Sequence, residues 1–162
     1  MNIEFSTKLT RSALYDYNIY HTYNSFTGLF GTGVGAIFLI LFASSFSISY
    51  LIAGVVIIAY LPVTIWLNVC QQVPKNEDKI KPFKYLLNDE GVTVSVGNDD
   101  ENTLTVPWDG FKKAVSTKKS IFLYTNKKSA FVFVRKDMGI DAADIIKIIC
   151  ANIVPQKNKI RF

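Results

Sequence analysis

Two apolar stretches decide the architecture of this chain: FTGLFGTGVGAIFLILFASSF at residues 26–46 and YLIAGVVIIAYLPVTIWLNV at residues 50–69. Each is close to the roughly 20 residues with which an α-helix crosses a hydrocarbon core of about 30 Å. Residues 12–74 contain no Lys or Arg, and Asp16 is their only carboxylate. The two stretches therefore predict a hairpin of transmembrane helices at residues 26–73, with a tight turn at residues 47–49.

Two other interpretations of the first stretch are weaker. A buried hairpin in a soluble protein would need the rest of the chain to cover two helices that are apolar all round, and the short strands that follow need a core of their own. A cleaved signal peptide would fit the small residues Ala43, Ser44 and Ser45. However, residues 1–25 precede the stretch, and a second apolar stretch follows it at once.

The charges beside the hairpin predict its orientation. Basic residues flank it on the side of both termini, whereas the turn carries no charge; these residues are Lys8, Arg11, Lys75, Lys79, Lys81 and Lys84. An excess of Lys and Arg marks the cytoplasmic side of a membrane protein. We therefore expect a protein of the cell membrane with two spans and both termini in the cytoplasm.

The rest of the chain divides into an N-terminal arm (residues 1–25), a charged linker (residues 74–82, PKNEDKIKP) and a C-terminal domain (residues 83–162). In the arm, residues 3–7 alternate apolar and polar side chains, which predicts a strand. A Tyr-rich helix, capped by Thr10, follows from Arg11 and leads to the membrane. Because the arm and the domain share one side of the membrane, we expect the arm strand to pair with the domain.

The C-terminal domain contains several short alternating segments before one amphipathic helix. Strands are predicted at residues 83–87, 92–96, 104–106, 121–125 and 130–134, with a further strand starting at Trp108. The helix begins at Asp141 (DAADIIKIICANIV). The fold class is therefore an α+β membrane protein: a helical hairpin plus a small antiparallel sheet closed by a C-terminal helix. This order of elements resembles a pleckstrin-homology-like (PH-like) domain.

Two segments carry a further resemblance: FKYLLNDEGVTVS at residues 83–95 and LTVPWDGFKKAVSTKKSIFLYTNKKSAFVFVRKD at residues 104–137. With the preceding strand, helix and two spans, they resemble the YcxB-like bacterial membrane proteins. The most specific part is Trp108, its acidic neighbour Asp109 and the lysines that follow. The chain departs from the expected pattern at residues 134–136, where a Pro is missing. The resemblance implies the architecture and supplies no catalytic residue or ligand.

Composition argues against an enzyme and against a cofactor. His21 is the only histidine, and Cys70 and Cys150 belong to no CxxC pair, so neither a catalytic triad, a metal site nor a disulfide is expected. The GTGVG run at residues 31–35 lacks the preceding strand and the Lys of a phosphate-binding loop. The acidic loop at residues 97–102 lacks the spaced oxygen ligands of a calcium loop. No motif indicates nucleic-acid binding.

Basic and small residues are the candidate binding positions. The net charge of +5 comes from the C-terminal part, whose strand ends and loops carry Lys112, Lys113, Lys118, Lys119, Lys127, Lys128, Arg135 and Lys136. These cations could converge on one rim that binds anionic lipid or an acidic protein, or they could be scattered over a soluble surface. In the spans, Gly31, Gly35 and Gly54 would let a helix approach closely, either within the hairpin or in a second copy of the chain.

Two functions fit these observations. The first is a membrane-anchored, non-enzymatic binding or regulatory module whose cytoplasmic domain binds anionic lipid or a protein partner. The alternative is a small accessory subunit of a membrane transport or immunity complex that assembles through its transmembrane helices.

Overall fold

The computed structural model describes residues 2–76, 79–97, 103–126, 129–154 and 158–160. The chain folds as two compact units. One unit combines Met1–Asp16 with Pro74–Phe162, and the other is Tyr17–Val73. The helix α1 (Arg11–Tyr23) contributes its first residues to one unit and its remaining residues to the other.

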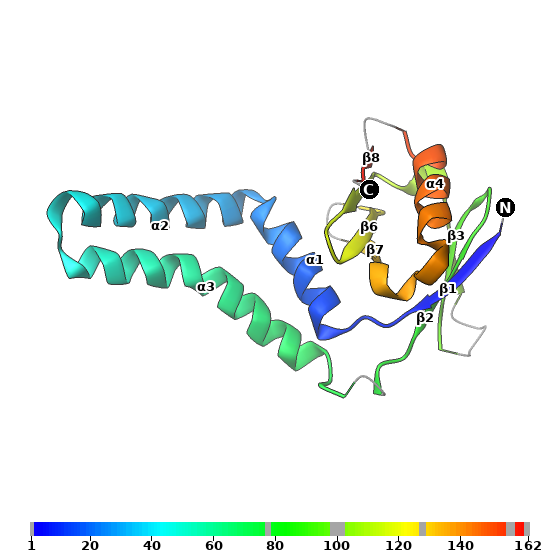
Figure 1. Cartoon of the computed structure of the whole chain (residues 1–162), viewed down its shortest axis with the longest axis horizontal. Helices are drawn as coiled ribbons and strands as arrows, with labels where there is room; N and C mark the ends of the chain where they lie inside the picture. Colours follow the sequence, from blue (N-terminus) through cyan, green and yellow to red (C-terminus); the bar gives the residue numbers. More distant parts are fainter. Residues whose placement is uncertain (1, 77–78, 98–102, 127–128, 155–157, 161–162) are drawn as a thin grey trace. The chain divides into compact units, whose positions relative to one another are not determined.

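Two long helices, α2 (Phe26–Ser45) and α3 (Ile48–Gln72), lie side by side as a hairpin (Figure 1). Ser25 caps α2, because its side chain accepts a hydrogen bond from the backbone N–H of Gly28 at 3.4 Å. Phe46 ends α2 in a left-handed conformation (φ 52°), and α3 begins two residues later. The turn is therefore shorter than we predicted, and α3 extends beyond residues 50–69 at both ends.

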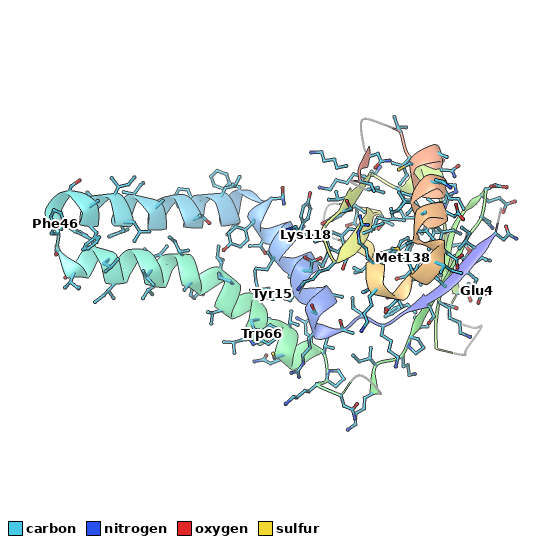
Figure 2. All side chains as sticks on the ribbon, in the orientation of Figure 1. Glu4, Tyr15, Phe46, Trp66, Lys118 and Met138 are labelled. Atoms are coloured by element: carbon cyan, nitrogen blue, oxygen red, sulfur yellow. The ribbon has the colours of Figure 1, made fainter. Side chains whose placement is uncertain are left out.

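Large apolar side chains cover the outside of this hairpin. Phe46, at the tip of the hairpin, is 82% exposed (Figure 2). In the most apolar 18 residues of each helix, only 11% are buried. The described part of the chain thus contains two helices that are long and apolar enough to cross a membrane.

Small residues bring α2 and α3 close together. Gly35 and Gly54 are both buried, and a Cβ atom on Gly35 would lie 2.5 Å from Ile58 Cγ1 and 3.3 Å from the carbonyl oxygen of Gly54. Gly31 is less crowded, with Leu61 Cδ1 at 3.4 Å from such an atom. The expected glycine packing therefore occurs within the hairpin.

The other unit contains two four-stranded sheets among its described residues. The first sheet is antiparallel, in the order β1 (Ile3–Thr7), β2 (Phe83–Leu87), β3 (Gly91–Val96) and β4 (Thr103–Pro107). The arm strand β1 pairs with β2, with Phe5 opposite Tyr85, which confirms the predicted pairing of the arm with the C-terminal domain. Side chains of β1 alternate between buried and exposed, so Ile3 and Phe5 enter the core.

The second sheet has the order β7 (Ala130–Val134), β6 (Ser120–Tyr124), β5 (Lys113–Ser116) and β8 (Asn158–Lys159), with β8 parallel to β5. We expected one antiparallel sheet, so both the number of sheets and this parallel pair correct the prediction. Short strands show which face is buried but not which sheet they join, because every alternating strand has the same pattern.

The strand predicted from Trp108 is also wrong at its start. Trp108–Gly110 forms a 3₁₀ turn, η3, and the strand begins at Lys113. The indole N–H of Trp108 donates to the carbonyl oxygen of Asn88 at 2.9 Å. The backbone N–H of Phe111 donates to the carbonyl oxygen of Trp108. Both aromatic side chains are buried in the core.

Short 3₁₀ turns, η4 (Arg135–Asp137) and η5 (Gly139–Asp141), lead into the helix α4 (Ala142–Asn152). Ile145 and Ile149 on this helix are fully buried and join one core with Leu87 of the first sheet and Phe133 of the second. This unit is therefore an α+β layer of two sheets closed by a helix.

Candidate anion-binding cleft

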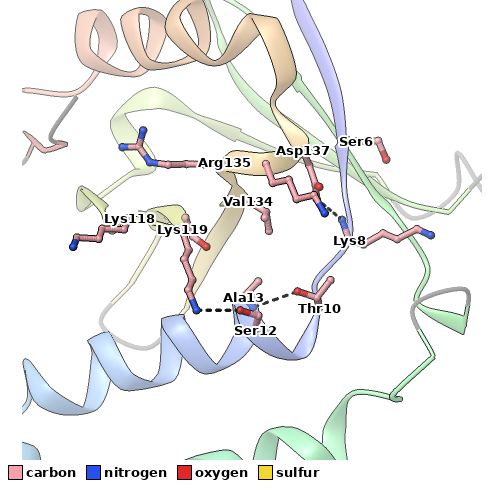
Figure 3. A pocket seen from close by; sticks show the side chains of 12 residues that line it. Ser6, Lys8, Thr10, Ser12, Ala13, Lys118, Lys119, Val134, Arg135 and Asp137 are labelled. Atoms are coloured by element: carbon pink, nitrogen blue, oxygen red, sulfur yellow. Dashed lines mark hydrogen bonds between the residues drawn. The ribbon is translucent and has the colours of Figure 1, made fainter.

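A cleft of about 710 Å³ opens in the unit that contains the sheets (Figure 3). Three segments line it: the arm from Ser6 to Ala13, the end of the β5–β6 turn with the first residue of β6 (residues 118–120), and the end of β7 with η4 at residues 134–137. These segments are distant in sequence, and the pairing of β1 in the first sheet brings the arm beside the second.

The lining of this cleft is strongly cationic. Its basic side chains are Lys8, Lys118, Lys119, Arg135 and Lys136, whereas Asp137 is the one carboxylate among its described lining residues. A concave wall of one charge sign concentrates the electrostatic field and attracts ions of the opposite sign. The positive lining of the cleft therefore favours an anion over a cation.

Thr117 shapes the turn that carries two of these lysines. Its hydroxyl accepts hydrogen bonds from the backbone N–H groups of Lys119 (3.2 Å) and Ser120 (3.0 Å), and it donates to the Asp16 carboxylate at 2.5 Å. The turn is thereby fixed to α1. Lys118 and Lys119 project from it (Figure 3).

Arg135 is held against the same turn. Its backbone N–H donates to the carbonyl oxygen of Lys119 at 2.9 Å, and its side-chain Nε donates to that of Thr117 at 3.2 Å. This side-chain hydrogen bond fixes the position of the Arg135 guanidinium against the turn.

The arm is attached to the opposite side of the cleft by Asp137. Its carboxylate accepts hydrogen bonds from the hydroxyl of Thr7 at 2.6 Å and from the backbone N–H of Lys8 at 3.2 Å. Lys119 Nζ donates to Ser12 Oγ at 3.3 Å, which links the arm to the turn (Figure 3).

The first turn of α1 adds to the positive potential. Thr10 caps this helix, since its hydroxyl accepts from the backbone N–H of Ala13 at 3.3 Å, and Thr10, Ser12 and Ala13 all line the cleft. A helix N-terminus carries a partial positive charge. Ser120 lines the cleft too, and its buried hydroxyl has no hydrogen-bond partner among the described residues.

The structure separates the eight predicted cations. Lys118, Lys119, Arg135 and Lys136 lie together in the cleft. Lys112 and Lys113 lie at the other end of β5 and β6, because Lys113 pairs with Tyr124 whereas Ser120, at the cleft end, pairs with Val134. Lys127 and Lys128 lie outside the described residues. The expectation of a single rim therefore holds for only part of the set.

Lys113 has a different environment from the cleft lysines. Its Nζ lies 4.6 Å from the centre of the Tyr124 ring, within range of a cation–π interaction. Burial lowers the pKa of Lys113, and the nearby charge of Lys159 lowers it further. Lys113 thus stabilises the strand end locally and does not extend the cleft.

Sequence reasoning missed the arm residues and Asp137 as parts of the site. One signal in the sequence could have separated Lys118 and Lys119 from Lys127 and Lys128. The two pairs belong to successive predicted turns of an up-and-down meander, and such turns lie at opposite ends of the strands. No comparable signal identifies Asp137, because Thr7 and Asp137 are 130 positions apart.

The cleft offers electrostatic binding and hydrogen-bond donors. No group of three or more His, Cys, Asp or Glu side chains in the described ranges is placed to hold a metal ion. Two of the cationic side chains in the cleft, Arg135 and Lys119, are held by hydrogen bonds to Thr117 and Ser12. The arrangement therefore suits recognition of an anion such as a phosphate group.

Comparison with known proteins supports the sequence resemblance. Residues 87–149 match the family model described as YcxB-like protein. No curated protein and no solved structure gives a significant match. The matched residues run from the end of β2 into α4 and include the cleft segments at residues 118–120 and 134–137. The sequence at residues 87–149 is therefore similar to the YcxB-like protein family.

Proposed function

We propose that this chain is a membrane-anchored, non-enzymatic binding module that takes the anionic headgroup of a lipid in the cationic cleft. The observation that carries the proposal is the excess of charge in one cavity, where five basic side chains accompany one carboxylate among the described lining residues.

The membrane anchor in this proposal is the pair α2 and α3. Their length, apolar composition and exposed large side chains suit a lipid environment. The basic residues next to both ends of the hairpin favour a cytoplasmic location for both termini. A basic domain tethered under an anionic leaflet gains about 1 kcal/mol for each basic residue near the surface.

The fold of the sheet unit agrees with this role. Two small sheets with a C-terminal helix against their shared core are the arrangement expected of a PH-like module. Such a fold says little about the ligand, so the cleft decides the ligand class.

A lipid headgroup fits the cleft better than a protein surface does. The volume of about 710 Å³ lies within the roughly 300–1,000 Å³ of small-molecule sites. An acidic protein would more often meet a broad, flat patch. The accessory-subunit alternative needs the glycines of the first span to be open to a partner helix, but Gly35 already packs against Ile58 and Gly54 within the hairpin.

Binding of a headgroup probe tests the proposal. The full-length chain in nanodiscs of neutral lipid would be titrated with glycerol 3-phosphate and, separately, with glycerophosphocholine, while NMR follows the Val134 methyl groups in the cleft. We expect only the anionic probe to shift these signals, and its binding to weaken as salt screens the cleft.

A matched pair of double variants locates the site. Lys118→Gln with Lys119→Gln should weaken glycerol 3-phosphate binding about tenfold, whereas Lys112→Gln with Lys113→Gln, which removes the same charge at the other strand end, should leave it almost unchanged. Equal losses in both would indicate nonspecific attraction. If the anionic probe does not bind at all, the lipid proposal fails and an acidic protein becomes the better partner.

A further inference from the structure

A second cavity, of about 320 Å³, lies in the sheet unit. Its walls come from both sheets: Phe83 and Tyr85 on β2, Val94 on β3, Leu104 on β4 and Phe131 on β7 are among its lining residues. Leu104 lines this apolar cavity and is nevertheless 55% exposed. The cavity is therefore an apolar extension of the core that water can reach.

The polar groups of this apolar cavity are already engaged. The hydroxyl of Thr7 donates to Asp137, and the hydroxyl of Tyr85 has a backbone hydrogen bond with Val132. Burial raises the pKa of Tyr85, which keeps this hydroxyl neutral. An apolar ligand would gain contacts here without breaking a hydrogen bond.

The arm separates the apolar cavity from the cationic cleft. Its residues alternate: Ser6, Lys8 and Thr10 line the cleft, whereas Thr7 and Leu9 line the apolar cavity. The strand β1 ends at Thr7, so past the edge of the sheet only the short loop at residues 8–10 separates the cleft from the apolar cavity. A hydrogen bond from the Thr10 N–H to the Lys8 carbonyl oxygen at 2.8 Å closes this loop.

We infer that the two cavities are the two halves of one site for an amphiphilic ligand. The phosphate headgroup of an anionic lipid lies in the cleft, and one acyl chain passes over the loop at residues 8–10 into the apolar cavity. This inference rests on the proposed function, since it requires the headgroup site. This class of ligand is chosen because the two faces of one loop differ: the cleft side is strongly positive and suits a phosphate, and the other side is apolar and suits an acyl chain.

Probes that differ in one part of the ligand test this inference. Full-length protein, with labelled Leu and Val methyl groups, would be titrated with glycerol 3-phosphate, hexanoyl lysophosphatidic acid and hexanoyl lysophosphatidylcholine. The second probe should shift Val134 in the cleft and also Val94 and Leu104 in the apolar cavity. It should bind at least about tenfold more tightly than the headgroup alone, because the burial of about two methylene groups already gives this factor.

Two variants disrupt the apolar cavity, one by filling it and one by removing part of its apolar wall. Ala130→Trp fills the cavity and Leu104→Ser removes an exposed wall, so each should bring the lysophosphatidic acid affinity down to that of glycerol 3-phosphate, whose own binding should not change. Thr105→Trp, on the exposed face of β4, is the control and should retain the tighter binding.

The outcomes separate the two proposals. If lysophosphatidic acid shifts only Val134 and gains no affinity, the amphiphile inference is overturned while the headgroup site stands. If the cleft responds to neither anionic probe, the proposed function itself fails. If both lysolipids shift Leu104 equally with Val134 unchanged, the apolar cavity is an independent site and the inference is also overturned.

Discussion

The two units of this chain use the same apolar residue types in opposite ways. In the sheet unit, Phe133 is fully buried, with its ring 5.1 Å from that of Phe5. In the hairpin, Phe26 is 82% exposed and Phe30 is 63% exposed. The sheet unit is stabilised by removing such rings from water, whereas the hairpin leaves them exposed on helices that are long and apolar enough to cross a membrane. The contribution of a phenylalanine to stability therefore depends on whether its unit buries the ring or leaves it exposed.

The largest expected effect tests this comparison directly. Phe133→Ala should destabilise the sheet unit by about 3–5 kcal/mol, because it leaves a cavity in a core that cannot close around it. Phe30→Ala, which removes the same atoms from an exposed position, should change the stability by less than about 0.5 kcal/mol. Urea unfolding of both variants in neutral-lipid nanodiscs would measure the difference. Equal losses would remove the distinction between the units.

The next effect concerns packing inside the hairpin. Gly35→Leu should weaken the association of α2 with α3 by about 1–3 kcal/mol, because its Cβ atom would overlap the Ile58 side chain. Gly33→Leu is the matched control, since no described atom lies within 4 Å of a Cβ atom there. Disulfide trapping between cysteines placed on the two helices would report their association. If the Gly33 variant separates the helices as much as the Gly35 variant does, close approach at Gly35 is not what holds them.

A smaller effect is expected where the sheet unit depends on polar contacts. Asp137→Ala should cost about 1–2 kcal/mol, because it leaves the buried Thr7 hydroxyl and the Lys8 N–H without their acceptor. Asp137→Asn keeps an acceptor oxygen and should recover part of this loss. Hydrogen exchange of residues 6–10 should rise in the Ala variant first. Unchanged exchange would show that Asp137 does not hold the arm.

The smallest effect appears at alkaline pH. Burial raises the pKa of Tyr85 above its ordinary value of 10.0, so above pH 10 the unfolded chain loses a proton that the folded chain keeps. The sheet unit should therefore lose stability as pH rises, by about 1 kcal/mol near pH 11 from this group. Tyr85→Phe should remove that part of the pH dependence. Identical slopes for the two proteins between pH 10 and 11 would contradict the burial of this hydroxyl.

Much of the fold could be predicted from local patterns. A long stretch without charges predicted the hairpin, and alternation at Ile3, Phe5 and Thr7 predicted a strand that needed a partner across the chain. The division into two sheets could not be predicted, because it depends on the pairing of strands that look alike. The short strand β8 contributes Asn158 and Lys159 only, too few residues to form a pattern.

The candidate site could be predicted only in part. Charge identified Lys118, Lys119, Arg135 and Lys136, but charge alone does not tell which strand end a lysine occupies. The register that pairs Lys113 with Tyr124 separates Lys112 and Lys113 from the cleft. The contribution of Lys8 needed the long-range pairing of β1, and that of Asp137 needed the three-dimensional structure.

The pairing of β1 with β2 has a consequence for how the protein is made. Ile3–Thr7 is synthesised before its partner strand Phe83–Leu87, which follows only after residues 8–82 have been synthesised. At about 5–20 residues per second, this delay is roughly 4–15 s. During that interval the N-terminal segment has no strand to pair with, and its apolar side chains are available to chaperones. The sheet unit can be finished only once both helices of the hairpin have been translated.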